Sequence, residues 1–326
     1  MVSVVIPVYN VAPYIEECLA SVGRQTYPDV ECVIVDDCGT DGSMSLVSNF
    51  IDKYSGTVRF HVVRQLSNSG LSASRNLGMS KSAGDFVFFL DGDDVITDDC
   101  LSRLVDVQHQ NDADCVVGSY RQVYNNGMKK DYVVRKPHGN LLMASVVEWQ
   151  ATAWNMLLRK RFLKTCNLQF EPGILHEDLL WNFYLLMNKP VMGYSSNITY
   201  FYYVRPESIM TSINAAVVSK RFISYQIILQ QMENKRLQMQ LDKSDATMIE
   251  SAFFVERTAR MMARMMLELG CKKEAYWLFC YARNHVYLPW YYCFLTSGVI
   301  LGDRCKIFYR LIPERLSFRL FLWLTL

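Results

Sequence analysis

Apolar runs alternate with amphipathic stretches along the first third of the chain. Runs such as Val2–Val8 and Val30–Val35 are rich in β-branched residues and predict strands. Between them, Ile15, Leu19 and Val22 share one face of a predicted helix. Alternating strands and helices indicate βαβ units and a mostly parallel sheet. The expected strands are 2–8, 30–35, 58–63, 86–90 and the start of one at 115–117, and the expected helices are 13–24, 43–53, 72–82 and 101–110.

The last third follows a helical pattern instead. Phe222, Tyr225, Leu229 and Met232 share one stripe, and the methionines of 261–266 are expected to fill a core rather than form a cofactor site. The sequence therefore predicts an α/β domain over 1–215 and a helical C-terminal region over 216–326.

Composition supports a folded chain whose charge is unevenly distributed. Hydrophobic residues make up 51% and charged residues 20%, which excludes disorder as the main state. Residues 1–215 hold 18 Lys and Arg against 23 Asp and Glu, whereas residues 216–326 hold 16 against 9. Because the basic excess lies far from the acidic motifs described below, nucleic acid is not an expected partner.

The cysteines and the N-terminus bear on location. None of the ten cysteines forms a C-x-x-C pair, so zinc-ribbon and thioredoxin sites have no support, and we expect free thiols in a reducing compartment. Met1 leads into a strand without a basic segment, which argues against a signal peptide. We expect a cytoplasmic protein.

Polar residues follow three of the predicted strands. Ligands of open α/β sheets bind outside the carboxyl ends of the strands, so these side chains are expected on one rim. The carboxylates among them repel one another unless a cation or cationic ligand joins them. The residues are Pro7, Tyr9, Asn10, Asp36, Asp37, Asp91, Asp93 and Asp94.

The sequence Asp91-Gly92-Asp93-Asp94 is the sharpest local signal. Carboxylates after a buried strand suit a hard divalent cation that also holds phosphate oxygens. Val95 and Ile96 occupy positions that would be Asp and Gly in an EF-hand loop, which excludes that motif. The alternative is an acidic turn that caps the next helix.

Three other motifs each have a structural and a functional interpretation. Asp36-Asp37 is either a turn before a helix or a carboxylate that accepts a hydrogen bond from a nucleobase imide. Arg75 either binds a phosphate or forms a surface salt bridge. Glu177 and Asp178 either complement a helix dipole or act chemically, but His176 lacks the second histidine of a zinc protease. Gly-x-Gly-x-x-Gly and Walker A sequences are absent.

As an ordered set, these motifs resemble the family 2 glycosyltransferases, which are inverting enzymes with the GT-A fold. The resemblance covers about residues 1–210, and the Gln-x-x-Arg-Trp motif of processive members is absent. Cys38 stands where the family usually has glycine, so we expect an altered loop with retained function. The motifs are Val4–Asn10, Tyr14–Leu19, Ser21-Val22, Gln25–Tyr27, Asp36-Asp37, Gly70–Ser72, Arg75–Gly78, Leu90–Asp94, Trp154-Asn155, His176–Asp178, Tyr202-Tyr203, Arg205 and Ser208-Ile209.

The resemblance implies transfer of a sugar from a nucleotide diphosphate to a hydroxyl of a glycan or lipid-linked acceptor, as in cell-surface polysaccharide synthesis. The catalytic residues would be Asp178, as the general base, and Glu177, which would shape the site or contact the acceptor. Asp37 would accept the uracil N3 proton, which favours a UDP-sugar. The other implied roles are base and ribose contacts for Pro7, Tyr9 and Asn10, nucleotide contacts for Asp36, phosphate contacts for Arg75, Mn²⁺ or Mg²⁺ binding by Asp91, Asp93 and Asp94, and diphosphate or lid contacts for Arg205, Ser208 and His176.

Alternatives remain at this point. A regulatory protein could bind a nucleotide sugar without turnover, and a nucleotidyltransferase would need a basic, glycine-rich triphosphate loop that is absent. Residues 271–326 hold eight basic residues, three acidic residues and many aromatic ones, including Trp277, Trp290, Tyr291 and Trp323. Such a segment predicts peripheral attachment to an anionic membrane, at its inner face. A helical cap or a contact between copies of the chain is the alternative.

Overall fold

The computed structural model describes residues 1–136, 152–205, 214–239, 246–285 and 318. The chain divides into two compact units, the first made of 1–136, 152–173 and 188–211, and the second of 137–151, 174–187 and 212–326. Residues 174–187 thus belong to the same unit as the C-terminal helices, although they come before the boundary expected at residues 215 and 216. A catalytic domain over 1–215 and a separate region over 216–326 stay a prediction.

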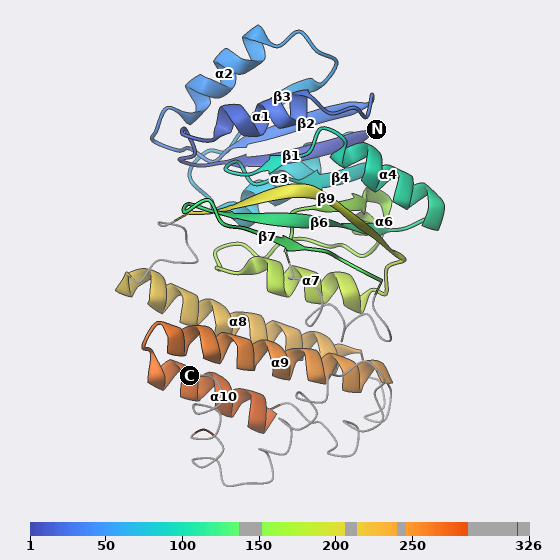
Figure 1. Cartoon of the computed structure of the whole chain (residues 1–326). Coiled ribbons are helices and arrows are strands. Elements are labelled where there is room, and N and C mark those ends of the chain that lie inside the picture. Colours follow the sequence, from blue (N-terminus) through green and yellow to red (C-terminus); the bar gives the residue numbers. More distant parts are fainter. Residues whose placement is uncertain (137–151, 206–213, 240–245, 286–317, 319–326) are drawn as a thin grey trace. The chain divides into compact units, whose positions relative to one another are not determined.

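The first unit is built on one mixed sheet, in the order β3-β2-β1-β4-β8-β6-β9-β5, with β7 paired to β6 (Figure 1). Strands β1 to β4 are parallel, as expected, and β6 pairs with β9 in parallel. The pairs β4–β8, β6–β8, β5–β9 and β6–β7 are antiparallel. The strands are β1 Val2–Val8, β2 Val30–Asp36, β3 Arg59–Arg64, β4 Phe86–Phe89, β5 Val95–Ile96, β6 Cys115–Tyr124, β7 Lys129–Tyr132, β8 Met156–Arg159 and β9 Met192–Val204.

Helices cover both faces of the parallel strands, which confirms the expected α/β class. Alternate residues of β1, such as Val4 and Ile6, pack in one core with Leu19 and Leu101 of two covering helices. On the other face, Gly78 of α3 lies so close to Val5 that a side chain there would clash. The helices of this unit are α1 Ile15–Gly23, α2 Ser43–Lys53, α3 Leu71–Lys81, α4 Cys100–Asn111 and α6 Lys160–Thr165.

Strand β6 shows where the sequence pattern was too short. The pattern predicted the start of a strand over 115–117, but β6 continues to Tyr124 and turns at Gly127, with a φ of 82°, into β7. The second half of β6 is only partly buried, so it lacks the apolar run that identified the other strands. Its partner β9 lies about 80 residues later and supplies the pairing.

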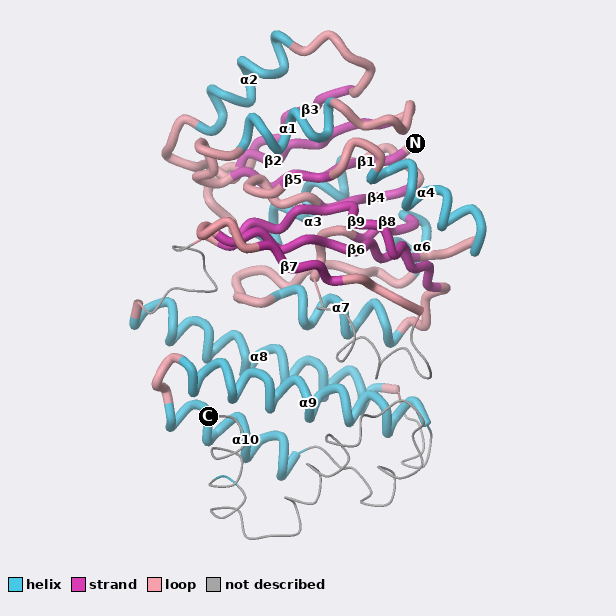
Figure 2. The backbone as a smooth tube through the Cα atoms, viewed as in Figure 1, coloured by secondary structure: helices cyan, strands magenta, loops and turns pink. Residues whose placement is uncertain are grey.

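The second unit is helical in its described part. It contains α7 Glu177–Met187, α8 Ala215–Gln238, α9 Ala246–Glu268 and α10 Lys272–His285, and the tube in Figure 2 shows α8, α9 and α10 as successive long helices. Met262 and Met266 are fully buried in its core, which confirms the interpretation of that stretch as core residues. None of the described helices is both long and apolar enough to cross a membrane.

The membrane-binding segment proposed from the sequence is described only over 271–285 and at residue 318. Trp277 on α10 is 39% exposed, and its ring meets Phe222 of α8 edge to face. Trp290, Tyr291 and Trp323 lie outside the described residues.

Candidate active site

The loops that follow β1 and β2 are fastened together at the rim of the parallel strands. Asn10 has a φ of 53°, and its side-chain oxygen accepts hydrogen bonds from the backbone amides of Thr40 (2.8 Å) and Asp41 (3.3 Å). A Cβ at Gly39 would lie 2.9 Å from the Asn10 amide nitrogen, so the loops touch at their backbones. Pro7 is buried within β1. Tyr9 is 45% exposed, which leaves a ring surface at this rim for a ligand.

Asp37 organises the loop that leads to α3. One carboxylate oxygen accepts from the amide of Ser69 (2.8 Å) and the side chain of Gln65 (3.1 Å), and the other accepts from the amide of Gly70 (3.0 Å). Two carboxylate oxygens offer about four acceptor positions, so one remains for a further donor. Asp37 can therefore hold this loop and still accept one hydrogen bond from a ligand.

Asp36 has different partners. It accepts a hydrogen bond from the amide of Cys38 at 2.9 Å and pairs with Arg64 at 3.3 Å. Cys38 takes a left-handed backbone conformation, with a φ of 57°, and its thiol reaches the carbonyl of Gln65. The position where the family usually has glycine thus requires a conformation that suits glycine.

Arg75 is buried and forms an ion pair rather than an exposed surface bridge. Its side chain is 3% exposed, one guanidinium nitrogen lies 2.7 Å from Asp91, and the group sits 5.4 Å from the centre of the Phe170 ring. Asp91 remains 24% exposed. Arg75 therefore presents positive charge beside the acidic turn, with the Asp91 carboxylate as one of its partners.

Asp94 fastens the acidic turn to β9. Its two oxygens accept hydrogen bonds from the hydroxyl of Tyr200 (2.8 Å) and the amide of Tyr203 (2.9 Å). Burial and the charges of Asp93 and Asp91 raise the pKa of Asp94 well above its usual value. Asp94 is 1% exposed and both of its oxygens already accept a hydrogen bond within the protein, so its main role in this structure is to hold the turn.

Asp93 is the carboxylate of this turn best suited to a ligand. Burial, followed by the charge of Asp91, raises its pKa to about 6, and Arg205 opposes that shift. Among the described residues, no group of three His, Cys, Asp or Glu side chains is placed to hold a metal ion. Metal binding by Asp91, Asp93 and Asp94 together stays a prediction. The remaining donor set, one or two carboxylates, suits Mg²⁺ or Mn²⁺ when substrate phosphates supply the other ligands.

Arg205 lies against the same turn. Its guanidinium is stacked on the rings of Tyr14 (3.8 Å to the centroid) and Tyr203 (4.8 Å), and one nitrogen donates to the carbonyl of Asp93 at 2.9 Å. Its Nε is buried, and the described residues provide no hydrogen-bond acceptor for it. Ser208, expected beside it, lies outside the described residues.

The other expected catalytic residues belong to the second unit. Glu177, which is buried, and half-buried Asp178 open α7. His176 has a φ of 59°, and its ring nitrogen lies 3.3 Å from the hydroxyl of Tyr225. Burial and the positive charge of Arg221 lower the pKa of His176 to about 4, so the ring is neutral at pH 7.

Several residues with a part in these arrangements were not among the predicted ones. Tyr200 and Gln65 position Asp94 and Asp37, and no local motif identifies them. Arg221 does carry a signal, because it precedes Tyr225 by four residues and so continues the apolar stripe of α8 with a charged residue. A charge on a buried stripe indicates a local partner.

Comparisons with known proteins agree with the fold. The model of the family described as "Glycosyl transferase family 2" matches residues 3–168. A poly(ribitol-phosphate) β-N-acetylglucosaminyltransferase of Staphylococcus aureus, TarP, is 30% identical over 62% of this chain and 62% of its own length. This chain spans about half of the length of several curated relatives that it matches.

Two solved structures share the architecture. S. aureus TarS 1–349 in complex with UDP-GlcNAc aligns with a TM-score of 0.63 at 19% identity, over 88% of this chain and 93% of that one. A mannosyltransferase of Pyrobaculum calidifontis in complex with GDP-Man and Mn²⁺ aligns with a TM-score of 0.53 at 17% identity, over 88% and 80%. These likenesses show the fold.

Proposed function

Because the chain belongs to glycosyl transferase family 2, we propose that it transfers a sugar from a UDP-sugar to a hydroxyl of a glycan or lipid-linked acceptor with inversion. One observation carries the proposal. The rim of the first unit offers an acceptor position at Asp37, after β2, and the Asp91–Asp94 turn beside Arg75, after β4, with β1 between the two strands. Uridine diphosphate has an imide donor at one end and phosphates at the other.

On this proposal Asp37 selects the nucleobase. The free acceptor position of its carboxylate takes the N3 proton of uracil, and Gln65, Ser69 and Gly70 hold the carboxylate in place. Cytosine has no such proton and would leave the carboxylate facing a lone pair. Tyr9 lies on the neighbouring loop, where its exposed ring can cover the base.

Asp93 and Asp91 would hold a divalent cation together with the donor's phosphate oxygens. When bound, such a cation neutralises the charge that develops on the leaving diphosphate. Arg75 orients the Asp91 carboxylate, and Arg205 fixes the backbone of the turn through the Asp93 carbonyl. The mannosyltransferase determined with GDP-Man and Mn²⁺ supports a cation in this fold.

Asp178 would remove the proton of the attacking hydroxyl. In a single displacement, the acceptor oxygen bonds to the anomeric carbon as the bond to the diphosphate breaks, and the hydroxyl proton passes to the carboxylate. The neutral ring of His176, two residues earlier, does not compete as a proton donor at pH 7. Glu177 is buried and shapes the start of α7.

The same proposal includes attachment of residues 271–326 to an anionic membrane surface, which would bring a lipid-linked acceptor to the site. Lys272 and Lys273 open α10 and Trp277 is partly exposed on it. Binding of the full chain to anionic vesicles, weakened by high salt, is the expected result; salt-insensitive binding or none would leave this segment as a helical cap or a contact between copies.

The test of donor selection changes the ligand rather than the protein. We expect UDP to bind at least about tenfold more tightly than N3-methyl-UDP or CDP in calorimetry with Mn²⁺, because each analogue lacks the imide proton. Equal affinities would contradict the role of Asp37. A UDP-sugar with an oligosaccharide acceptor should then release UDP; tight binding without turnover would instead indicate a regulatory protein.

A further inference from the structure

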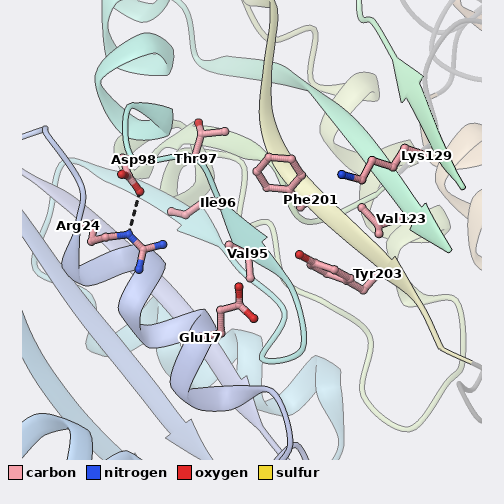
Figure 3. A pocket seen from close by; sticks show the side chains of 10 residues that line it. All are labelled: Glu17, Arg24, Val95, Ile96, Thr97, Asp98, Val123, Lys129, Phe201 and Tyr203. Atoms are coloured by element: carbon pink, nitrogen blue, oxygen red, sulfur yellow. Dashed lines mark hydrogen bonds and ion pairs between the residues drawn. The ribbon is translucent and has the colours of Figure 1, made fainter. Parts of the chain in front are cut away.

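A pocket of about 340 Å³ opens on the first unit and is lined by side chains other than those assigned to the donor (Figure 3). It lies between the outer face of α1, strand β5 and the sheet surface of β6, β7 and β9. None of its lining residues is among those proposed to bind nucleotide or metal. They are Glu17, Arg24, Val95, Ile96, Thr97, Asp98, Val123, Lys129, Phe201 and Tyr203.

Two charged side chains in this pocket are available to a ligand. The Glu17 carboxylate and the Lys129 ammonium group point toward the cavity from opposite sides (Figure 3). Within the described part of the chain, neither side chain forms a hydrogen bond or an ion pair, and both residues are exposed. Glu17 accepts hydrogen bonds only, and Lys129 donates only, so together they suit a ligand with both donors and acceptors.

The remaining charges of the pocket neutralise each other. Arg24 and Asp98 form an ion pair at 3.1 Å on one wall. The lining thus has two positive and two negative groups, and no net charge. A free phosphate or a nucleotide would meet two carboxylates here, and a polyamine would meet two cations. The balance favours a neutral polar ligand.

Aromatic and apolar side chains supply the rest of the wall. The ring of Phe201 and the hydroxyl of Tyr203 reach the cavity from β9, and Val95 and Ile96 of the paired strand β5 lie beneath them. An aromatic ring packs well against the C–H face of a pyranose, while the hydroxyl groups at the ring's edge bond to charged side chains. The volume falls at the lower end of the range for ligand sites, enough for about one or two sugar rings.

We propose that this pocket is a second saccharide-binding site, which holds a neutral glycan unit through Glu17, Lys129 and the rings of Phe201 and Tyr203. The inference goes beyond the proposed function, because it requires binding at a place where no sugar is transferred. Such a site would hold part of a glycan acceptor while another of its hydroxyl groups reacts. Tyr203 also gives the site a connection to the donor rim, because its amide bonds to Asp94 and its ring supports Arg205.

The experiment measures saccharide binding separately from donor binding. Cellobiose and maltotriose serve as neutral probes, and glucuronate, glucosamine and inorganic phosphate as charged ones, in saturation-transfer NMR titrations of the full chain. We expect a neutral probe to bind, and the double variant Glu17→Gln, Lys129→Gln to weaken it at least about tenfold, through the loss of two charged hydrogen bonds. UDP affinity and the unfolding temperature should stay unchanged.

The matched control is the double variant Glu16→Gln, Lys130→Gln, which alters the adjacent exposed residues of α1 and β7 outside the pocket lining. It should bind the saccharide as the unaltered chain does. The proposal is overturned if neither neutral probe binds, if both double variants bind equally well, or if a charged probe binds more tightly than the neutral ones. Because UDP binding is followed in the same samples, loss of the donor site would be seen as a separate failure.

Discussion

Three carboxylates are buried at the strand-end rim of the first unit, and three arginines are buried among the helices of the second. Asp36, Asp37 and Asp94 are 6%, 3% and 1% exposed, and Arg221, Arg236 and Arg260 are 1%, 4% and 8% exposed. In the first unit the buried carboxylates accept hydrogen bonds from backbone amides, and these bonds fix the loops. In the second, Arg221 acts on the protonation of His176. Buried carboxylates thus fix loops in the first unit, and in the second unit a buried arginine lowers the pKa of a neighbouring histidine.

The largest expected effect comes from the proposed base in the second unit. Asp178→Asn keeps the size of the side chain but removes the proton acceptor, so turnover should fall by roughly 10²–10⁴. UDP affinity should change little, because the proposed donor contacts belong to the first unit. Initial rates of UDP release and calorimetric titration with UDP check both expectations. Activity within a few-fold of the unaltered enzyme would move the base elsewhere, and Glu177→Gln is the next variant to test.

The adjacent carboxylates Asp93 and Asp94 test the role given to buried charge in the first unit. Only Asp94 is expected to hold the backbone of the turn in place. Asp94→Ala leaves the Tyr200 hydroxyl and the Tyr203 amide without their acceptor, so the free energy of unfolding should fall by about 2–4 kcal/mol. Asp93→Ala removes a carboxylate whose ionised form is disfavoured in the fold, so stability at pH 7 should hold or rise.

Urea unfolding of both variants measures this difference, with the exposed Asp98→Ala as a control expected to stay within about 1 kcal/mol. Metal-dependent UDP binding should be lost in Asp93→Ala. If Asp94→Ala is as stable as the control, the role of Asp94 in fastening the turn to β9 is wrong.

The dependence of stability on pH tests the role given to buried charge in the second unit, because it reports the protonation of His176. Its pKa is about 4 in the fold and about 6.5 in the unfolded chain, so the unfolded state takes up the proton first as the pH falls. Above about pH 6.5 the titration of His176 does not reduce the free energy of unfolding. As the pH falls from 6.5 toward 4, protonation of the unfolded chain lowers that free energy by at most about 3 kcal/mol. His176→Asn tolerates the left-handed backbone and should reduce this dependence on pH.

Unfolding curves at pH 7, 5.5 and 4.5 compare that variant with the unaltered chain. The variant starts from a lower stability at pH 7, because it lacks the ring contact with Tyr225, but loses less on acidification. If the variant and the unaltered chain lose the same unfolding free energy on acidification, His176 takes up its proton in the folded protein over this pH range, and the lowered pKa is wrong.

The smallest expected effect is at the departure from the family pattern. Cys38→Gly relieves a left-handed backbone conformation worth about 1–2 kcal/mol in a non-glycine residue, but it loses the thiol contact with Gln65 and adds freedom to the unfolded chain. The opposing effects should leave the unfolding free energy within about 1 kcal/mol, with UDP affinity unchanged. A large loss of UDP binding, measured by calorimetry, would show that the thiol shapes the nucleotide loop.

The sequence predicted the fold best where a single element carries its own signal. The bounds of β1 and α2 match the expected ranges, since a continuous apolar run or a regular helical face needs no distant partner. The partners of Asp94 could not be predicted, because Tyr200 lies 106 residues later and only the β5–β9 pairing brings it near. For the same reason the acidic turn was expected to act as one cation cage, although one of its carboxylates is engaged with the protein.

The short segment from Ser69 to Arg75 has a consequence for which donors can fit. Its first two amides hold Asp37, and its arginine, one and a half helical turns later, holds Asp91. A helix rises about 1.5 Å per residue, so the first turns of α3 fix the separation between the two carboxylates. In the proposed binding mode the base lies at Asp37 and the phosphates lie near Asp91. The length of this segment therefore bears on the length of donor that can contact both carboxylates. A nucleoside monophosphate donor, with one phosphate fewer, would reach less far along it.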